Sequence, residues 1–217
     1  MNLITSLNRK DFAELIASKI IQEKDRIKTQ YEVSKNKIGF FFIDDLLPQE
    51  ITTHIQSQFP SHEDMVLKKS LRENKFIAVQ MNQYAAVLEE LIYAFQDERV
   101  VNLIKDICEI NDLQPDENLY AGGLSSMKQS QFLNPHLDNS HDNERNSWRV
   151  LNLLFYVTPN WEDSSGGHLE IWPDGLKQDP IILYSKFNRL VVMATHGKSW
   201  HSVSPVIADA SRNCVSN

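Results

Sequence analysis

The stretch Phe132-Leu-Asn-Pro-His-Leu-Asp138 is the part of this chain that points most directly to a fold and a chemistry. On a β-strand, side chains two residues apart point to the same face, so His136 and Asp138 converge on one point. An imidazole and a carboxylate so placed supply two ligands of a 2-His-1-carboxylate site, which holds Fe(II) and leaves coordination positions open. The third ligand must come from elsewhere, and His201, in the distant stretch Trp200-His-Ser-Val203, is the candidate.

The other histidines are weaker candidates for metal ligands. His141 follows Asp138 in a polar loop, where a solvated histidine is the simpler interpretation. His196 lies five residues before His201, a spacing that would turn it to the opposite face of a continuous strand. We assign no ligand role to the remaining three, His54, His62 and His168. We therefore expect none of these five histidines to bind the metal.

Length and composition favour one soluble domain that spans residues 1–217. The chain has 217 residues, of which 41% are hydrophobic and 24% charged, which is enough for a core without disulfide bonds. The formal net charge of -7 argues against nucleic acid or an anionic membrane as a partner. The two cysteines, Cys108 and Cys214, lie among apolar neighbours, and neither a signal peptide nor a membrane span is recognisable. These features predict a cytoplasmic protein.

Residues 1–115 show mainly helical periodicity, with a buried strand near their start. Apolar residues recur at threes and fours after Asn8, which suits an N-cap position. A continuous apolar run around Phe41 indicates the strand, and Pro48 suits the first turn of the helix that follows. The last helical stretch fits either one helix or two, with Asp97-Glu98 as the place where a bend would divide it. The predicted helices span residues 8–31, 48–58 and 84–110, and the predicted strands residues 38–43 and 76–81.

After Pro115 the pattern changes to short strands separated by polar turns. Eight such strands predict a jelly roll or double-stranded β-helix. The fold class is therefore α+β, with residues 1–115 as a helical support and residues 116–217 as the core that carries the metal site. The last strand reaches the final residue, Asn217, which is unusual for a closing strand and indicates a longer natural chain. The predicted strands span residues 118–127, 131–137, 148–157, 167–172, 180–184, 189–194, 200–206 and 212–217.

Several motifs of the second half occur in an informative order. They are His136-Leu-Asp-Asn139, Arg149 to Trp161 (RVLNLLFYVTPNW), Gly166-Gly-His-Leu-Glu-Ile-Trp172, Phe187-Asn-Arg-Leu190 and His201-Ser-Val-Ser-Pro-Val206. From Tyr120 onward, the chain thereby resembles the Fe(II)/2-oxoglutarate-dependent dioxygenases, most closely their prolyl 4-hydroxylase-like branch. The strand and helix between Ile38 and Gln58 resemble the entry segment of that branch less specifically.

The resemblance implies a role for each residue that matches a family motif. It makes iron ligands of His136, Asp138 and His201. It places at Arg212 the cation that holds the far carboxylate of 2-oxoglutarate, a role that the planar arginine fork suits. It also implies that Tyr156 offers its hydroxyl to the same carboxylate and that Leu169 lines the co-substrate. The residues alone leave other interpretations open, namely a surface position for Arg212 and ordinary core positions for Tyr156 and Leu169.

The activity implied by the resemblance is hydroxylation of an unactivated C–H bond. Its cofactors would be Fe(II), 2-oxoglutarate and O2, with ascorbate as an optional addition. Asp138 favours hydroxylation, because related halogenases lack this carboxylate. Two other classes stay open: a non-catalytic jelly-roll binding protein, which would normally have lost a ligand, and a cupin-like metalloenzyme without 2-oxoglutarate, which would not need Arg212.

The substrate is less well defined than the chemistry. By analogy, the resemblance favours a peptidyl or amino-acid-like substrate over other small molecules. The negative net charge favours a neutral or cationic one. The polar loop from Asn139 to Ser147 (NSHDNERNS) begins beside Asp138, so it is either a lid over the site or a plain solvated loop.

Overall fold

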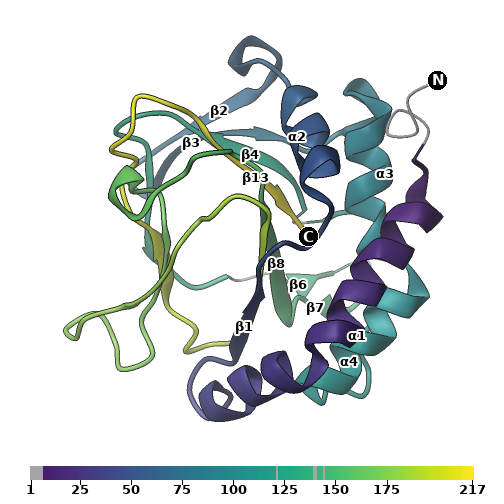
Figure 1. Cartoon of the computed structure of the whole chain (residues 1–217). Coiled ribbons are helices and arrows are strands. Elements are labelled where there is room, and N and C mark those ends of the chain that lie inside the picture. Colours follow the sequence, from purple (N-terminus) through teal and green to yellow (C-terminus); the bar gives the residue numbers. More distant parts are fainter. Residues whose placement is uncertain (1–6, 121, 139–140, 144) are drawn as a thin grey trace.

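A computed structural model describes residues 7–120, 122–138, 141–143 and 145–217. It shows helices packed along one side of a curled antiparallel sheet, as expected for the double-stranded β-helix (Figure 1). The helices are α1 (Arg9–Ser34), α2 (Gln49–Ser57), α3 (Ala86–Ala94) and α4 (Glu98–Cys108), with short 3-10 turns η2 (His62–Asp64), η3 (Met81–Gln83) and η4 (Asp163–Ser165). No helix in the described part of the chain has the length and apolar character needed to cross a bilayer.

The strands of the large sheet follow the order β1-β11-β8-β13-β4-β3-β5-β12-β9-β10, with β2 paired to β3. β3 pairs with β4 near one end and with β5 near the other, so it joins the two parts of the curled sheet. Their bounds are β1 (Phe40–Ile43), β2 (Val66–Lys69), β3 (Glu73–Ala78), β4 (Gly123–Met127), β5 (Phe132–His136), β8 (Leu151–Tyr156), β9 (Leu169–Ile171), β10 (Ile181–Leu183), β11 (Arg189–Ala194), β12 (His201–Val203) and β13 (Arg212–Ser216).

The helix α1 begins where the sequence predicts and ends at Ser34, three residues beyond the predicted end. The Asn8 side chain accepts hydrogen bonds from the backbone nitrogens of Lys10 and Asp11. The Asp11 carboxylate in turn accepts one from the Asn8 backbone nitrogen, which makes a capping box. The buried face includes Phe12, Ile16, Ile20 and Ile27. Each such side chain contributes roughly 1.5–3 kcal/mol by leaving water, so packing on the sheet, more than helix propensity, stabilises α1.

The stretch predicted as one or two helices between residues 84 and 110 is two helices. Asp97 lies between them, and its side chain accepts a hydrogen bond from the Arg99 backbone as the N-cap of α4. Pro48 is the N-cap residue of α2 and not part of its first turn, so that helix starts one residue later than predicted. Helix ends commonly differ by this much between descriptions.

The apolar strands β8 and β11 are buried on both faces, which explains their continuous apolar sequences. On β11, Leu190 and Val192 pack toward the helices, whereas Val191 and Met193 face the inside of the barrel. On β8, Phe155 belongs to the helix-side cluster and the inner face carries polar side chains among its apolar ones. The sheet therefore has an apolar outer face for the helices and an inner face available for a site.

The sequence pattern gave no indication of β2. It placed β3 at residues 76–81, whereas the strand spans Glu73–Ala78. All four residues of β2 are exposed, so the strand shows no alternation of apolar and polar residues. The polar loop at residues 139–147, which the sequence offers as a lid or a plain solvated loop, also contains a short β-hairpin. Within it, β6 (His141–Asp142) pairs with β7 (Ser147–Trp148), and the Arg145 guanidinium contacts the carboxylates of Asp142 and Asp116. Residues 139, 140 and 144 lie outside the described part, and the lid stays a prediction.

Candidate metal centre and co-substrate pocket

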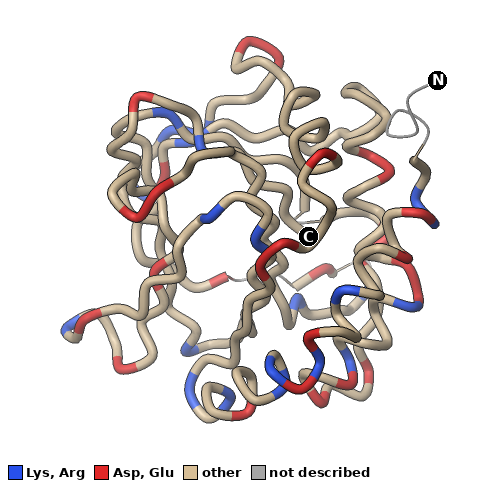
Figure 2. The backbone as a smooth tube through the Cα atoms, viewed as in Figure 1, with Lys and Arg blue, Asp and Glu red and all other residues tan. Residues whose placement is uncertain are grey.

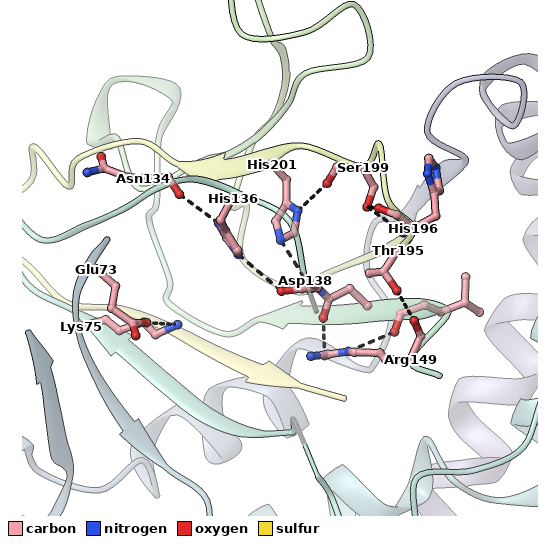
Figure 3. A network of polar contacts seen from close by, with 12 residues as sticks. Glu73, Lys75, Asn134, His136, Asp138, Arg149, Thr195, His196, Ser199 and His201 are labelled. Carbon is pink, nitrogen blue, oxygen red and sulfur yellow. Dashed lines mark hydrogen bonds and ion pairs between the residues drawn. The ribbon is translucent and has the colours of Figure 1, made fainter. Parts of the chain in front are cut away.

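Two paired strands bring the predicted metal ligands together. His136 at the end of β5 is the direct register partner of His201 at the start of β12, and Asp138 follows β5 by two residues. One ligand atom from each of the three lies within 4.8 Å of the others. The Nε2 atoms of His136 and His201 are 3.5 and 3.6 Å from the Asp138 carboxylate oxygens (Figure 3). Among the described residues, no other three ligand-type side chains converge in this way.

Hydrogen bonds to the backbone fix which nitrogen of each imidazole is available. The Nδ1 atom of His136 lies 2.9 Å from the carbonyl oxygen of Asn134, and that of His201 lies 2.9 Å from the carbonyl of Ser199. A carbonyl only accepts, so each Nδ1 carries the hydrogen and each Nε2 presents a lone pair. Two lone pairs and a carboxylate that face one another would repel without a cation between them. The donor set fits Fe(II) for this reason.

The charges around the cluster keep it ready for a cation. Burial raises the pKa of Asp138, but the contact with His136 and the nearby His201 and Arg149 outweigh burial and hold that pKa well below its ordinary value. Burial lowers the pKa of His201 to about 4, and the neighbouring His136 acts in the same direction. Near neutral pH, Asp138 is therefore ionised and His201 is neutral, which are the forms that bind metal.

Asn152 orients the carboxylate, a role that is not evident from the sequence alone. Its side-chain nitrogen donates a hydrogen bond of 2.9 Å to Asp138 Oδ2 from the inner face of β8. Arg149 donates to the side-chain oxygen of Asn152, which fixes the direction of the amide because a guanidinium has no acceptor. The sequence offers only a partial signal: an asparagine inside the apolar run from Arg149 to Trp161 is buried and needs a partner.

Arg212 lies inside the barrel and not on the surface. It is 3% exposed, and its Nε donates to the hydroxyl of Ser185 at 3.2 Å. Its guanidinium carbon is 4.8 Å from the ring centroid of Tyr156. Within the described residues it forms no ion pair, although a buried guanidinium without a carboxylate is costly. The interior of the fold therefore holds a cation that suits a bound anion.

Tyr156 presents the matching unsatisfied group. Its hydroxyl is buried and has no hydrogen-bond partner among the described residues. An orphaned buried hydroxyl costs about 1–3 kcal/mol. Burial also raises the pKa of Tyr156, against the opposing effect of Arg212, so the phenol keeps its proton and can donate it. A carboxylate between Tyr156 and Arg212 would satisfy both, and that is the chemistry of the far end of 2-oxoglutarate.

The strand β9 connects the metal cluster with this pocket. Ile171 is the register partner of His201, and Leu169 lies two residues away in the apolar cluster that contains Tyr156. Leu169 is buried, which is expected both for a residue that lines the co-substrate and for an ordinary core residue. Just before β9, Gly167 has φ +65, and an added Cβ would lie 2.9 Å from Arg212 Cδ. The glycine therefore leaves room for the Arg212 stem to reach the interior.

The other five histidines lie outside the cluster. His168 packs between the Asp163 carbonyl and the backbone nitrogen of Ser185. The imidazole of His62 contacts Ser126, and that of His141 contacts two asparagines of its own hairpin. His54 lies on α2, and His196 makes local contacts in the turn before β12.

Comparison with known proteins agrees with this geometry. Residues 122–217 match the family model described as the 2OG-Fe(II) oxygenase superfamily. The match covers the part of the chain that carries all three candidate metal ligands. The enzyme is accordingly a 2-oxoglutarate-dependent dioxygenase that uses Fe(II), 2-oxoglutarate and O2. Among curated proteins, none matches the sequence.

Solved structures share the fold at low sequence identity. A prolyl-4-hydroxylase from Pseudomonas putida superposes with a TM-score of 0.66 at 16% identity, covering 88% of this chain and 96% of that one. A prolyl hydroxylase from Trichoplax adhaerens, in complex with a hypoxia inducible factor peptide fragment, gives 0.61 at 18% identity and 90% of both chains. The non-heme alpha ketoglutarate dependent epimerase SnoN, from nogalamycin biosynthesis, gives 0.60 at 13% identity and covers 88% and 80%. The same fold therefore serves more than one reaction.

Proposed function

We propose that this chain hydroxylates an unactivated C–H bond of a peptidyl or amino-acid-like substrate. In this proposal His136, Asp138 and His201 hold Fe(II), and Arg212 with Tyr156 holds the far carboxylate of 2-oxoglutarate beside Leu169. The observation that carries the proposal is the convergence of three ligand atoms within 4.8 Å, with both imidazole Nδ1 atoms already bonded to carbonyls. The unsatisfied Tyr156 hydroxyl supports the second half.

Each residue has a defined task in this proposal. When bound, Fe(II) and 2-oxoglutarate supply the oxygen activation on which C–H hydroxylation depends. Asn134 and Ser199 orient the two imidazoles through their carbonyls, and Asn152 holds the Asp138 carboxylate. The apolar side chains around Leu169 exclude water from the inner face of the barrel. The chain itself thus orients the ligands and fixes the direction of the co-substrate.

The choice of reaction and substrate rests on supporting observations of different weight. The structural relatives include prolyl hydroxylases, one of them bound to a peptide fragment. Asp138 fills the carboxylate position that halogenases of this family lack. The buried Arg212 argues against a cupin-like enzyme without 2-oxoglutarate, which has no use for a cation there. A non-catalytic role would not explain why all three predicted ligands converge.

The same proposal treats residues 1–217 as one dioxygenase domain in a cytoplasmic protein. One apolar cluster joins α1, α3 and α4 to the outer face of β8 and β11, which supports a helical layer that does not fold apart from the barrel. The cysteines Cys108 and Cys214 are both buried as free thiols, and free thiols suit a reducing compartment.

Two measurements test the proposal. Anaerobic titration with Fe(II) and then with 2-oxoglutarate should give one site for each, with a visible charge-transfer band only when both are present. A peptide array incubated with Fe(II), 2-oxoglutarate and O2 should then yield succinate together with products heavier by one oxygen atom. Failure to bind Fe(II) near neutral pH, or turnover that does not need 2-oxoglutarate, would contradict the proposal.

A further inference from the structure

The hairpin formed by β2 and β3, residues 66–78, carries a charge opposite to that of the whole chain. We call it the basic hairpin. It has four cations, Lys68, Lys69, Arg72 and Lys75, against one carboxylate, Glu73, in a chain of net charge -7. Figure 2 shows Lys and Arg gathered along the strands that Figure 1 labels β2 and β3. Positive charge is therefore concentrated here while the rest of the chain is more acidic still.

The cations of the basic hairpin are largely without acidic partners. Lys75 pairs with Glu73 at 2.9 Å. In the part of the chain that the structure describes, Lys68, Lys69 and Arg72 form no ion pair. Lys68 and Lys75 are direct register partners, a like-charge pair that is unfavourable across two strands. Positive charge that is kept together at a cost to stability suits a binding surface for an anionic group.

Register places part of this charge on the face that lines the barrel. In antiparallel pairs, register partners project to the same face of the sheet. Lys75 lies two residues before Ile77, and so shares its face. A ladder of partners leads across the sheet from Ile77 through Ser125 and Cys214 to Tyr156. Lys75 and its partner Lys68 therefore project on the same face as the co-substrate pocket.

One residue joins the tip of the hairpin to the metal cluster. The Asn134 side chain donates to the carbonyl of Leu71 at 2.7 Å, and its backbone nitrogen donates to the carbonyl of Arg72 at 2.8 Å. The carbonyl of the same Asn134 orients the His136 imidazole. In Figure 3, Asn134 lies on the same side of that imidazole as Glu73 and Lys75 of the hairpin. A ligand on the hairpin would thus lie beside the metal cluster.

The tip of the hairpin also offers an apolar contact. Leu71 is 94% exposed, and Val66 and Leu67 on β2 are exposed as well. The one aromatic side chain of the hairpin, Phe76, is covered by two neighbours. Its ring centroid lies 4.5 Å from that of His62 and 5.4 Å from the Lys128 Nζ atom. Exposed leucine with lysine and arginine suits a peptide, whereas single-stranded nucleic acid is usually held by exposed aromatic rings that stack on the bases.

We propose that the basic hairpin binds an acidic segment of a peptide substrate and so selects substrates with Asp or Glu near the residue to be modified. The inference rests on the proposed function, because it takes the His136 cluster as the reacting centre. It departs from the preference for a neutral or cationic substrate that net charge suggests. The local field at the site, more than the total charge of the chain, governs which peptide approaches.

The test uses three fluorescent probes with the full chain, Fe(II) and 2-oxoglutarate under anaerobic conditions. The first is a peptide with a central proline, a leucine and several Asp and Glu residues. The second has Asn and Gln in place of the acids, and the third is an oligothymidine of the same net charge as the first. Fluorescence anisotropy should show the acidic peptide binding about tenfold more tightly than the neutral one, with the advantage shrinking as salt is added.

Two sets of variants locate the effect. The triple variant Lys68→Gln/Lys69→Gln/Arg72→Gln should lose about tenfold in affinity for the acidic peptide and little for the neutral one, as expected for three exposed charge contacts. A matched control, Lys10→Gln/Lys28→Gln/Lys177→Gln, changes net charge equally at exposed positions outside the hairpin and should bind normally. The reversed variant Lys68→Glu/Arg72→Glu should prefer a lysine-containing version of the peptide.

The outcomes separate this inference from the proposed function. Equal binding of acidic and neutral peptides, tighter binding of the oligothymidine, or an equal loss in the control triple variant would overturn it. Fe(II) and 2-oxoglutarate affinities are measured on every variant. If both are normal and no charge preference appears, the docking inference fails and the proposed function stands. If the unmodified chain does not bind Fe(II), the proposed function fails, and with it the inference.

Discussion

The proposed metal end and the proposed co-substrate end of the barrel differ in how their polar groups are satisfied. At the metal end, His136, His201 and Asp138 each have a protein partner that fixes their orientation. At the co-substrate end, the Tyr156 hydroxyl has no partner among the described residues, and Arg212 has neutral ones. The chain thus builds one end in advance and leaves the other for a ligand to complete. Loss of a residue should therefore have different consequences at the two ends.

The largest effect is expected at the metal end. His201→Ala should abolish Fe(II) binding and all turnover, because two remaining ligands rarely hold the ion. Calorimetric titration with Fe(II) under anaerobic conditions would measure this directly. His141→Ala is the matched control, since its imidazole contacts only its own hairpin among the partners identified, and it should bind iron almost normally. Iron loss in the control with retention in His201→Ala would refute the ligand assignment.

At the co-substrate end, Arg212→Ala should weaken 2-oxoglutarate binding and leave the iron in place. A charge-assisted bidentate contact is worth about 1.5–3 kcal/mol, or roughly ten- to a hundredfold in affinity. Titration of the iron-loaded variant with 2-oxoglutarate gives the affinity. Arg212→Lys keeps the charge without the planar fork, so its affinity for 2-oxoglutarate should lie between those of the unmodified chain and Arg212→Ala. If Arg212→Ala binds 2-oxoglutarate normally, Lys198 is the next cation to substitute.

Asn152→Ala tests how much of the metal end is arranged in advance. It removes the hydrogen bond that holds Asp138, and loss of such an orienting partner typically lowers metal affinity at least about tenfold. The apparent 2-oxoglutarate affinity at saturating iron should change far less. Asn146→Ala, at an exposed position in the β6–β7 hairpin, is the control. Unchanged iron affinity in Asn152→Ala would show that the carboxylate does not need this support.

Tyr156→Phe should stabilise the protein without co-substrate but weaken the binding of 2-oxoglutarate. Without 2-oxoglutarate, removal of an orphaned hydroxyl should stabilise the fold by about 1 kcal/mol, which urea unfolding would detect. Affinity for 2-oxoglutarate should fall by roughly fivefold, since about 1 kcal/mol of hydrogen bonding is lost. Equal stability of the two proteins would mean that the hydroxyl is satisfied in solution, and the contrast between the two ends would weaken.

Part of the candidate metal site could be predicted from the sequence because His136 and Asp138 lie two residues apart, whereas the choice of His201 depended on the family resemblance. His136 and Asp138 do lie together, although β5 ends at His136 and Asp138 follows the strand, and the capping residue and periodicity located α1. The residues that orient the candidate ligands could not be predicted in this way. Asn152 meets Asp138 only through the pairing of distant strands, and an asparagine in an apolar run does not reveal which partner it serves.

The basic hairpin shows a second limit of sequence reasoning. The strand β2 is exposed at every position, so neither alternation nor apolar content marks it. Total charge also concealed it, because a sum over the chain does not show that several cations share one hairpin beside the metal cluster. The pairing of β3 with β5 is what places that charge next to the strand that carries His136.

The register of His136 with His201 has a consequence for folding. An ion held between these two residues clamps β5 to β12 and closes a long stretch of chain that contains β8 and β11. Metal occupancy then enters the folding equilibrium, because an ion that binds only the native state adds about 2.7 kcal/mol of stability when its free concentration is a hundred times its Kd. Cellular iron supply would thus set not only how fast this enzyme works but also how much of it survives proteolysis.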